Sequence, residues 1–439
     1  MTEEAPVRVF DALKATPAPV RYLLGGVLIN QLGAFVQTFL VLYLTFRGAS
    51  VSTAGLSLVA YSAGSVFGTM LGGEITHRSG PRATIMTAMA ASAPLVAAIP
   101  WLGGPGKLVP LLVVVGLAGL FTQAYRPAAA VLLSDLMPDR YQVMAFSMMR
   151  IALNIGAAVA PLIAAGLILV DWDLLFWIDG ATALVYALLA FALLPRKAAP
   201  AGAEAEADAA GTDGVAAGAG KRPAAGSRSA YGAMLRDRPY LSFLAAVLLG
   251  SLTYAQGHIA LPLELVEDGY PTSFYSTVLT VSSVVLISCE LKITAYLSRL
   301  PKHVRVITGH LVEAVGLAAY GLSSRSGAFT ITGAVLVVCG IMIAAPSMFA
   351  HPATFPATIK ARYIGTMQAV GGMASALAPL FGVFLWSRMG SGFWLLCGVV
   401  TGIAGLLALA GVKEPAEPDA PADRATSTEG KPESVGGTS

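Results

Sequence analysis

The chain has 439 residues, of which 56% are hydrophobic and only 12% charged, and its formal net charge is +3. This composition excludes an ordinary soluble globular domain, and so small a charge gives no reason to expect nucleic acid as a partner. Cys289, Cys339 and Cys397 all lie in apolar runs without the spacing of metal ligands. We therefore expect no metal site and no cofactor.

Twelve apolar stretches follow one another along the chain. Each has the roughly 20 residues that a helix needs to cross about 30 Å of hydrocarbon. We therefore predict an all-α membrane protein with twelve transmembrane helices. Their expected limits are 22–46, 53–75, 83–103, 108–135, 144–170, 174–195, 239–262, 274–298, 304–323, 328–350, 364–388 and 392–412.

The second half of the chain repeats landmarks of the first half in the same order. Pro127 has its counterpart in Pro346, and the Ala-Pro-Leu sequence at 160–162 returns at 378–380. An internal repeat at a nearly constant offset indicates a duplicated unit, and a parallel repeat is one of the two architectures of secondary transporters. We predict two six-helix bundles arranged as a 6+6 parallel repeat.

The expected domain limits follow from these stretches. They are an N-terminal tail at 1–21, a first bundle at 22–195, a linker at 196–238, a second bundle at 239–412 and a C-terminal tail at 413–439. The linker and the last tail lack apolar periodicity, which is typical of disordered chain. Of the 28 Lys and Arg residues, 21 lie in the tails, the linker and the turns on the same side, which predicts that both termini are cytoplasmic.

A short polar turn joins the second and third expected helices. Gly80 and the proline after it break the helix, because glycine reaches positive φ cheaply and proline lacks a backbone donor. The turn resembles the signature loop of the major facilitator superfamily, glycine-x-x-x-aspartate-arginine-x-glycine-x-arginine/lysine. Gly73, Arg78, Gly80 and Arg82 fit this pattern, and His77 stands where the family usually has aspartate.

The resemblance implies that this loop is a conformational gate that steadies the outward-facing state of the transporter. His77 cannot supply the fixed negative charge of an aspartate, but Glu74, one turn before Arg78, can act as the acid instead. Arg82 and Arg78 also have Asp135 or the carbonyls at helix C-termini as alternative partners. A tight basic turn without a gating role is the other interpretation.

The fifth expected helix carries a second pattern. Residues 154–161 are similar to the family's antiporter motif, glycine-x-x-x-glycine-proline, with Ala160 in place of the second glycine before Pro161. Gly156, Ala160 and Ala164 form a stripe of small residues that permits close helix approach. The resemblance implies that this segment, with Gly156, Ala160 and Pro161, packs against a helix of the other half and belongs to the conformational gate that governs which side opens. The region between residues 126 and 161 is also similar to bacterial twelve-helix drug-efflux members.

Polar side chains within the apolar stretches mark the expected substrate cavity, because a polar group at this depth faces a cavity or a partner. By the resemblance, helices 1, 4, 7 and 10 line the cavity, with helices 2, 5, 8 and 11 beside them. For Arg150, a structural hydrogen bond or snorkelling to the surface is the alternative. The candidates are Asn30, Gln37, Gln123, Arg126, Arg150, Asn154, Gln256 and Gln368.

Glu290 is the main candidate for proton coupling. A carboxylate buried in an apolar helix favours its protonated form unless a cation lies nearby. The alternatives are a static ion pair with Arg126, Arg150 or Lys292, or a position closer to the surface than expected. Further candidates are Asp179 and His258.

We expect a monomeric plasma-membrane transporter whose partners are the lipid bilayer, a small molecule and protons. The predicted function is proton-coupled efflux of a small apolar drug or secondary metabolite by alternating access. Uptake of a small polar metabolite, such as a sugar, amino acid, peptide or organic anion, is the alternative, and Arg126 with Arg150 favours an anion. Although His310 and Glu313 form a close pair, no catalytic cluster or nucleotide-binding loop is present, so we expect neither an enzyme nor an ATP-driven pump.

Overall fold

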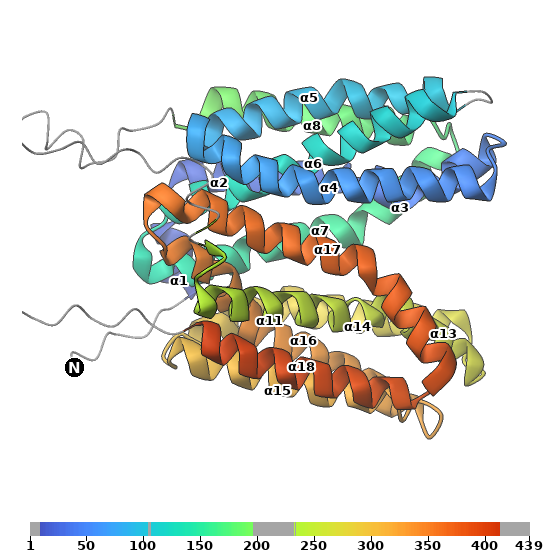
Figure 1. Ribbon diagram of the computed structural model, residues 1–439, viewed down its shortest axis with the longest axis vertical. Coiled ribbons are helices and arrows are strands. Elements are labelled where there is room, and N and C mark those ends of the chain that lie inside the picture. The colour runs from blue at the N-terminus through green and yellow to red at the C-terminus, as the bar shows by residue number, and fades with distance from the viewer. Residues whose placement is uncertain (1–8, 104–106, 196–231, 233, 413–439) are drawn as a thin grey trace, which may run out of the picture.

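The computed structural model describes residues 9–103, 107–195, 232 and 234–412. Most of the predicted linker and the predicted C-terminal tail lie outside the described residues. In the described part the long elements are all helices, and they form two bundles (Figure 1). The predicted all-α fold with twelve helices in two six-helix bundles is confirmed.

The first bundle contains the helices before the linker. A short helix and a 3-10 turn accompany them, and the short helix was not expected because residues 1–21 were predicted to be a tail. The elements are α1 (Val9–Ala15), α2 (Ala18–Leu32), α3 (Val36–Phe46), α4 (Val51–Ser79), α5 (Pro81–Leu102), α6 (Leu108–Leu136), η1 (Asp139–Tyr141), α7 (Gln142–Ile168) and α8 (Leu174–Leu193).

The second bundle repeats this plan after the linker. Its elements are α11 (Arg238–Tyr254), α12 (Gln256–Ile259), α13 (Leu261–Glu267), α14 (Thr272–Leu297), α15 (Lys302–Tyr320), α16 (Gly327–Ala350), η2 (His351–Thr354), α17 (Ala357–Met389) and α18 (Gly392–Gly411).

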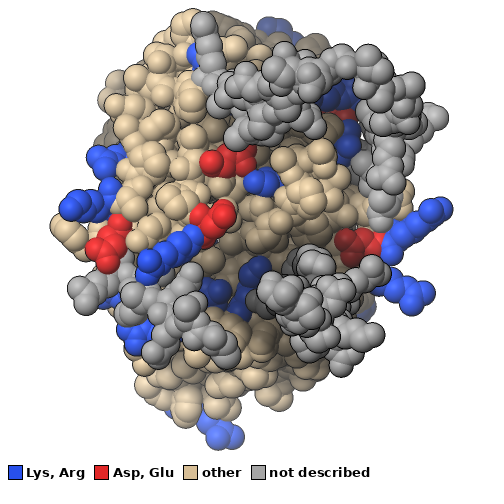
Figure 2. Space-filling view, turned by 90° about the vertical axis from the view of Figure 1, so that its left-hand side faces the viewer, with Lys and Arg blue, Asp and Glu red and all other residues tan. Residues whose placement is uncertain are grey.

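The two bundles lie next to each other with their helices roughly parallel, and α7 and α17 run between them (Figure 1). Helix α1 begins and α18 ends at the same end of the molecule, which we call the termini side. The turns at 47–50 and 321–326 lie at the other end, the opposite side. Figure 2 views the termini side directly, and Lys and Arg side chains lie over this face with Asp and Glu among them.

Two of the expected helices are broken rather than continuous. The first is divided into α2 and α3 around Gly33, and Asp179 of α8 accepts hydrogen bonds from the backbone N–H groups of Phe35 at 2.9 Å and Val36 at 3.1 Å. The seventh is divided into α11, α12 and α13, where Gln256 donates to the carbonyl of Ala378 at 3.1 Å. Breaks within a membrane are tolerated where neighbouring helices satisfy the freed backbone groups.

Helix α15 forms close to its expected place but differs from the others in composition. Eleven membrane spans in the described part are long and apolar enough to cross a bilayer, and α15 is not among them. It carries Arg305, His310 and Glu313, all buried inside the bundle. The expectation that all twelve stretches are apolar enough is therefore wrong for 304–323, because α15 turns a polar face inward.

Candidate functional site

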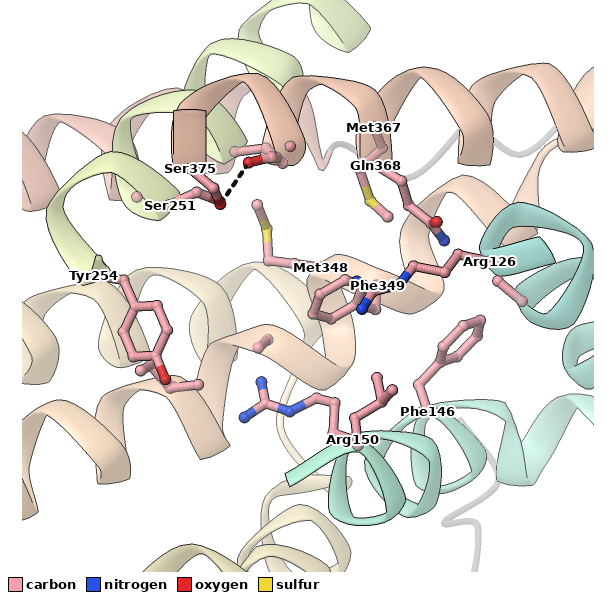
Figure 3. A pocket seen from close by; sticks show the side chains of 18 of the residues that line it. Arg126, Phe146, Arg150, Ser251, Tyr254, Met348, Phe349, Met367, Gln368 and Ser375 are labelled. Atoms are coloured by element: carbon pink, nitrogen blue, oxygen red, sulfur yellow. Dashed lines mark hydrogen bonds between the residues drawn. The ribbon is translucent and has the colours of Figure 1, made fainter. Parts of the chain in front are cut away.

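A cavity of about 520 Å³ lies between the two bundles. Its walls come from α4, α6 and α7 of the first bundle and from α11 and α14 to α17 of the second. Aromatic and methionine side chains from both bundles line it, among them Phe146, Met348, Phe349 and Met367 (Figure 3). The volume is in the range that holds a small organic molecule, and the thioethers are adaptable packing partners.

Five of the predicted cavity residues line this space, namely Gln123, Arg126, Arg150, Asn154 and Gln368. The side chains of Arg126 from α6 and Arg150 from α7 extend into it (Figure 3). Among the described residues, Arg126 has neither an ion pair nor a side-chain hydrogen bond, and its Nε atom is buried without a partner. Its guanidinium group is therefore available to an acceptor group in the cavity.

Three predicted cavity residues lie elsewhere. Asn30 is buried in α2, Gln37 is exposed on α3, and Gln256 is fully buried, where it donates to the carbonyls of Leu252 and Ala378. The prediction assumed that each segment is one continuous helix. The breaks after Leu32 and Tyr254 interrupt that pattern of faces, so these side chains do not line the cavity.

Glu290 lies next to a predicted partner. Its carboxylate is 3.0 Å from the Nε atom of Arg150, and its side chain is fully buried behind the cavity rather than in its lining. This ion pair connects α7 of the first bundle to α14 of the second. One turn nearer the termini side, the hydroxyl groups of Ser147 and Thr294 make a second connection at 2.9 Å.

The two further candidates for proton coupling do not meet Glu290. Asp179 is buried and accepts the two N–H groups at the start of α3, which is a capping arrangement. His258, in α12, lines a separate cavity of about 100 Å³, and its ring is 5.7 Å from that of Tyr254 in an edge-on arrangement. The structure therefore distributes the three candidates over three different places.

Sequence reasoning left one pair of cavity residues out. His310 and Glu313 of α15 both line the cavity, although helix 9 was not among the expected cavity helices. The available signal was the polar content of this helix, with a histidine and an acid one turn apart in an otherwise apolar region.

The backbones of α4 and α17 touch on the termini side. A Cβ atom added to Gly73 would lie 2.8 Å from the carbonyl oxygen of Ala361 and 3.1 Å from the Cα of Gly365. Both are closer than an added side-chain atom tolerates, so glycine at position 73 permits this close approach of the two bundles.

Ion pairs surround this contact. Arg362 of α17 donates to both carboxylate oxygens of Glu74 on α4, at 2.7 and 3.1 Å, and Glu74 also accepts from Arg78 at 2.8 Å. Lys360 pairs with Asp135 of α6 at 2.8 Å. Glu74 thus pairs with Arg78 across one helical turn, as its spacing predicts, and connects the two bundles as well.

The remaining residues of the predicted gate loop hold the first bundle together. Gly80 has a φ of 83° where α4 gives way to α5, a conformation that favours glycine. Arg82 donates to the carbonyl of Ala190 at 3.1 Å and to that of Phe191, both near the C-terminus of α8. His77 lies in the last turn of α4 and is partly buried.

The small-residue stripe of α7 packs within its own bundle. A Cβ atom added to Gly156 would lie 2.5 Å from the Cγ of Gln31 in α2, and Ala160 and Ala164 belong to an apolar cluster of the first bundle. Pro161 is exposed. The expectation that this stripe contacts the other half is therefore wrong for this conformation, in which α7 reaches α14 through residues nearer the termini side.

The polar contacts between the bundles share one location. In the described part of the chain, the side-chain hydrogen bonds and ion pairs with known partners that cross between the bundles all lie in the half nearest the termini side. They are Ser147–Thr294, Arg150–Glu290, Glu74–Arg362, Lys360–Ser134 and Lys360–Asp135. Within the described ranges, the known polar contacts thus close the cavity on the termini side.

Comparisons with known proteins fit this arrangement. A model of the Major Facilitator Superfamily matches residues 23–354. An uncharacterized MFS-type transporter of Bacillus subtilis (strain 168), YqjV, is 24% identical over 307 residues, and the match spans 65% of this chain and 66% of the relative, just under two thirds. A Na+, Li+, K+/H+ antiporter of Planococcus maritimus is 23% identical over 381 residues, 82% of this chain and 87% of the relative.

Solved structures share the fold at low identity. The human organic anion transporter MFSD10 (TETRAN) superposes with a TM-score of 0.67 at 14% identity, over 89% of this chain and 100% of that chain. The transporter FucP in its outward conformation gives a TM-score of 0.70 at 15% identity, over 90% and 98%. Since the family model covers well over half of the sequence, the protein belongs to the major facilitator superfamily and is a multi-pass membrane transporter of small molecules.

Proposed function

We propose that the protein is a proton-coupled secondary transporter that exports a small, mainly apolar molecule by alternating access. One observation carries this proposal: the cavity lies between two bundles, and the polar contacts that connect them among the described residues, where both partners are known, lie on the termini side. Two bundles that rock around a site at their interface expose it to each side of the membrane in turn.

The bias of Lys and Arg toward the termini side supports a cytoplasmic location of both termini in the plasma membrane. With that orientation, the contacts around Gly73 and Glu74 close the cytoplasmic side, and the present conformation is outward-facing. The closing contacts combine these ion pairs with close packing of α4 on α17 around Gly73, and they have to separate when the cytoplasmic side opens.

Proton coupling is supported by the buried ion pair between Arg150 and Glu290. A proton bound or released near this pair changes the charge around it and can weaken the attraction between α7 and α14. The cost of leaving an unpaired guanidinium group at this depth favours separation of the bundles on the termini side. The Planococcus relative is a Na+, Li+, K+/H+ antiporter, which is in line with such coupling.

The lining of the cavity supports a substrate with an apolar body and one acceptor group. Apolar side chains, among them methionine and aromatic ones, line most of the space, while Arg126 offers a guanidinium group that is unpaired among the described residues. A second candidate function, transport of an organic anion, is favoured by the same observation together with Arg150, which shares the cavity.

The experiment uses purified protein in liposomes that contain a pH-sensitive dye. A proton gradient is imposed, and tetraphenylphosphonium, a neutral apolar antibiotic and an aromatic carboxylate are added in turn. We expect one of these compounds to trigger proton flux. That compound should accumulate on the side of the membrane that the protons leave. Movement of a compound without proton flux would contradict proton coupling, and preference for the carboxylate would favour the second candidate.

Glu290→Gln tests the role of the ion pair, and Glu267→Gln is its matched control because Glu267 is exposed on α13. The first variant should bind and exchange substrate with an altered balance between the two open states. The second should behave like the original protein.

A further inference from the structure

Helix α15 turns its polar residues toward the centre of the molecule. Arg305, His310 and Glu313 are buried, whereas Leu311 and Val315 of the same helix are exposed. A charged side chain within a membrane span costs at least about 2.5–3.5 kcal/mol on insertion scales, so it is retained where it has a partner or a function.

The polar face of α15 lies between α16 and α11 and lines the cavity. A Cβ atom added to Gly340 of α16 would lie 2.6 Å from the backbone nitrogen of Glu313, so the backbones of α15 and α16 touch there. On the other flank, a Cβ atom added to Gly250 of α11 would lie 3.6 Å from the Nε2 atom of His310. Both residues therefore reach the cavity between α11 and α16, from a helix of the outer layer.

Among the residues that the structure describes, the Glu313 carboxylate has no partner. Its residue is only 5% exposed, it lines the cavity, and in the described part of the chain it makes neither a hydrogen bond nor an ion pair. His310, one turn before it, places Nδ1 2.8 Å from the carbonyl of Val306, so Nδ1 carries the hydrogen of the neutral ring and Nε2 is an acceptor.

The charged and titratable groups that face Glu313 come from several helices. They are Arg150 of α7, Tyr254 of α11, and His310 and Tyr320 of α15, with Glu290 of α14 beyond Arg150. Helices α16 and α18, which pack on α15, contain no Asp, Glu, Lys, Arg or His. Arg150 is the single positive side chain in this set, and it is engaged by Glu290 at 3.0 Å.

We propose that Glu313, with His310 beside it, is a proton-binding site of the cavity, and that the coupled proton resides there rather than on Glu290. A proton is the smallest cation that neutralises a buried carboxylate without a counter-ion, and water in the cavity can deliver it. Glu290 is less suited because Arg150 already neutralises it and separates it from the cavity. This inference rests on the proposed proton coupling and names the residue that carries it.

The site has a direct connection to the closure of the termini side. When Glu313 gives its proton back to water, it becomes a second carboxylate that attracts Arg150. It then competes with Glu290 for the guanidinium group, and the ion pair between α7 and α14 weakens. Occupancy of Glu313 by a proton thereby alters a contact that connects the two bundles.

The first test measures proton binding without any substrate. Purified full-length protein in lipid nanodiscs is titrated with acid, and infrared difference spectra record the carbonyl stretch of carboxylic acids in water and in heavy water. We expect a titrating band in the original protein, in Glu290→Gln and in Glu267→Gln, and its loss in Glu313→Gln. Persistence of the band in Glu313→Gln, or its loss in Glu290→Gln, would overturn the proposal.

Glu313→Asp is the control for a folding defect. It keeps a carboxylate at this position on a side chain that is one methylene shorter. It should restore a titrating band at a shifted position, and failure to do so in a variant that elutes as a folded monodisperse species counts against the site. His310→Asn should keep the band and move its titration midpoint. An unmoved midpoint would exclude the histidine from the site.

The second test uses the liposomes with tetraphenylphosphonium as the probe. Glu313→Gln should still exchange labelled for unlabelled probe, but its proton-driven accumulation of the probe should fall by at least about 10-fold. If proton-driven accumulation in this variant equals that of the original protein, the inference is overturned, while proton-coupled transport stands. If the original protein moves no probe at all, the proposed function fails for this compound class, while the infrared titration still decides the fate of Glu313.

Discussion

Arg362 of α17 donates hydrogen bonds to both carboxylate oxygens of Glu74 on α4, at 2.7 and 3.1 Å. This two-point contact between a planar guanidinium group and a carboxylate fixes geometry as well as charge. Glu74 thus supplies the negative charge that His77, at the family's usual aspartate position, cannot. It does so from the face of α4 that touches the other bundle.

Replacement of Arg362 by Ala should open the termini side. The lost charge-assisted hydrogen bonds are worth roughly 1.5–3 kcal/mol, which corresponds to a change of about 10- to 100-fold in the balance of the two states. A cysteine introduced at Ala361, which is buried against Gly73, reports the opening through its rate of reaction with a maleimide in a variant without the native cysteines.

The charge exchange Glu74→Arg with Arg362→Glu provides the control for this experiment. It keeps one charge of each sign at the contact and should restore most of the protection of the introduced cysteine. Either fast labelling of the exchanged variant or slow labelling of Arg362→Ala would contradict the role of the pair in closing the termini side.

Gly73→Val should also open the termini side, but through a steric clash rather than a lost ion pair. Its side chain would collide with the backbone of α17 around Ala361 and Gly365, so the closed termini side becomes strained. Gly25→Val is the matched control, because a Cβ atom at Gly25 meets nothing within 4 Å. Equal labelling rates in the two valine variants would show that the contact does not limit opening.

Arg126→Ala should weaken substrate binding without loss of stability. Because Arg126 has no ion pair in the described part of the chain, its removal leaves no buried carboxylate behind. For a substrate with an acceptor group we expect KM to rise about 10- to 100-fold, the value of one charge-assisted hydrogen bond, at an unchanged melting temperature. A substrate without an acceptor group serves as the control, and a similar rise for it would contradict the assignment.

Asp179→Ala should lower stability and leave proton coupling in place. The substitution removes the acceptor of the Phe35 and Val36 N–H groups, and each buried donor without a partner costs about 1–3 kcal/mol. Thermal unfolding in detergent measures this loss, and Asp179→Asn, which keeps one acceptor oxygen, should lose less. Normal melting combined with abolished proton flux would instead make Asp179 a coupling residue.

The helices could be predicted from the sequence because a bilayer demands a minimum length of apolar residues. The last stretch, expected at 392–412, is α18 at Gly392–Gly411. The same physics identified part of the cavity, since polar groups such as Gln123 and Arg126 within apolar helices have few other places to lie. These features depend on local composition alone.

The parts that were missed depend on residues far away in the chain. The break after Leu32 is stabilised by Asp179, more than 140 residues later, and it removes Gln37 from the expected face. Likewise, the backbone of Glu313 packs directly on Gly340 of another helix, and this contact helps to place Glu313 at the cavity. No periodicity within a single helix contains that information.

The polar face of α15 has a consequence for biogenesis. With Arg305, His310 and Glu313 within 19 residues, α15 is too polar to partition into lipid as an isolated helix leaving the translocon. The following helix, α16, is apolar, and its Gly340 contacts the backbone of α15 directly. We therefore expect the two helices to enter the bilayer together as a hairpin, and a bulky substitution at Gly340 to impair membrane insertion before any substrate is transported.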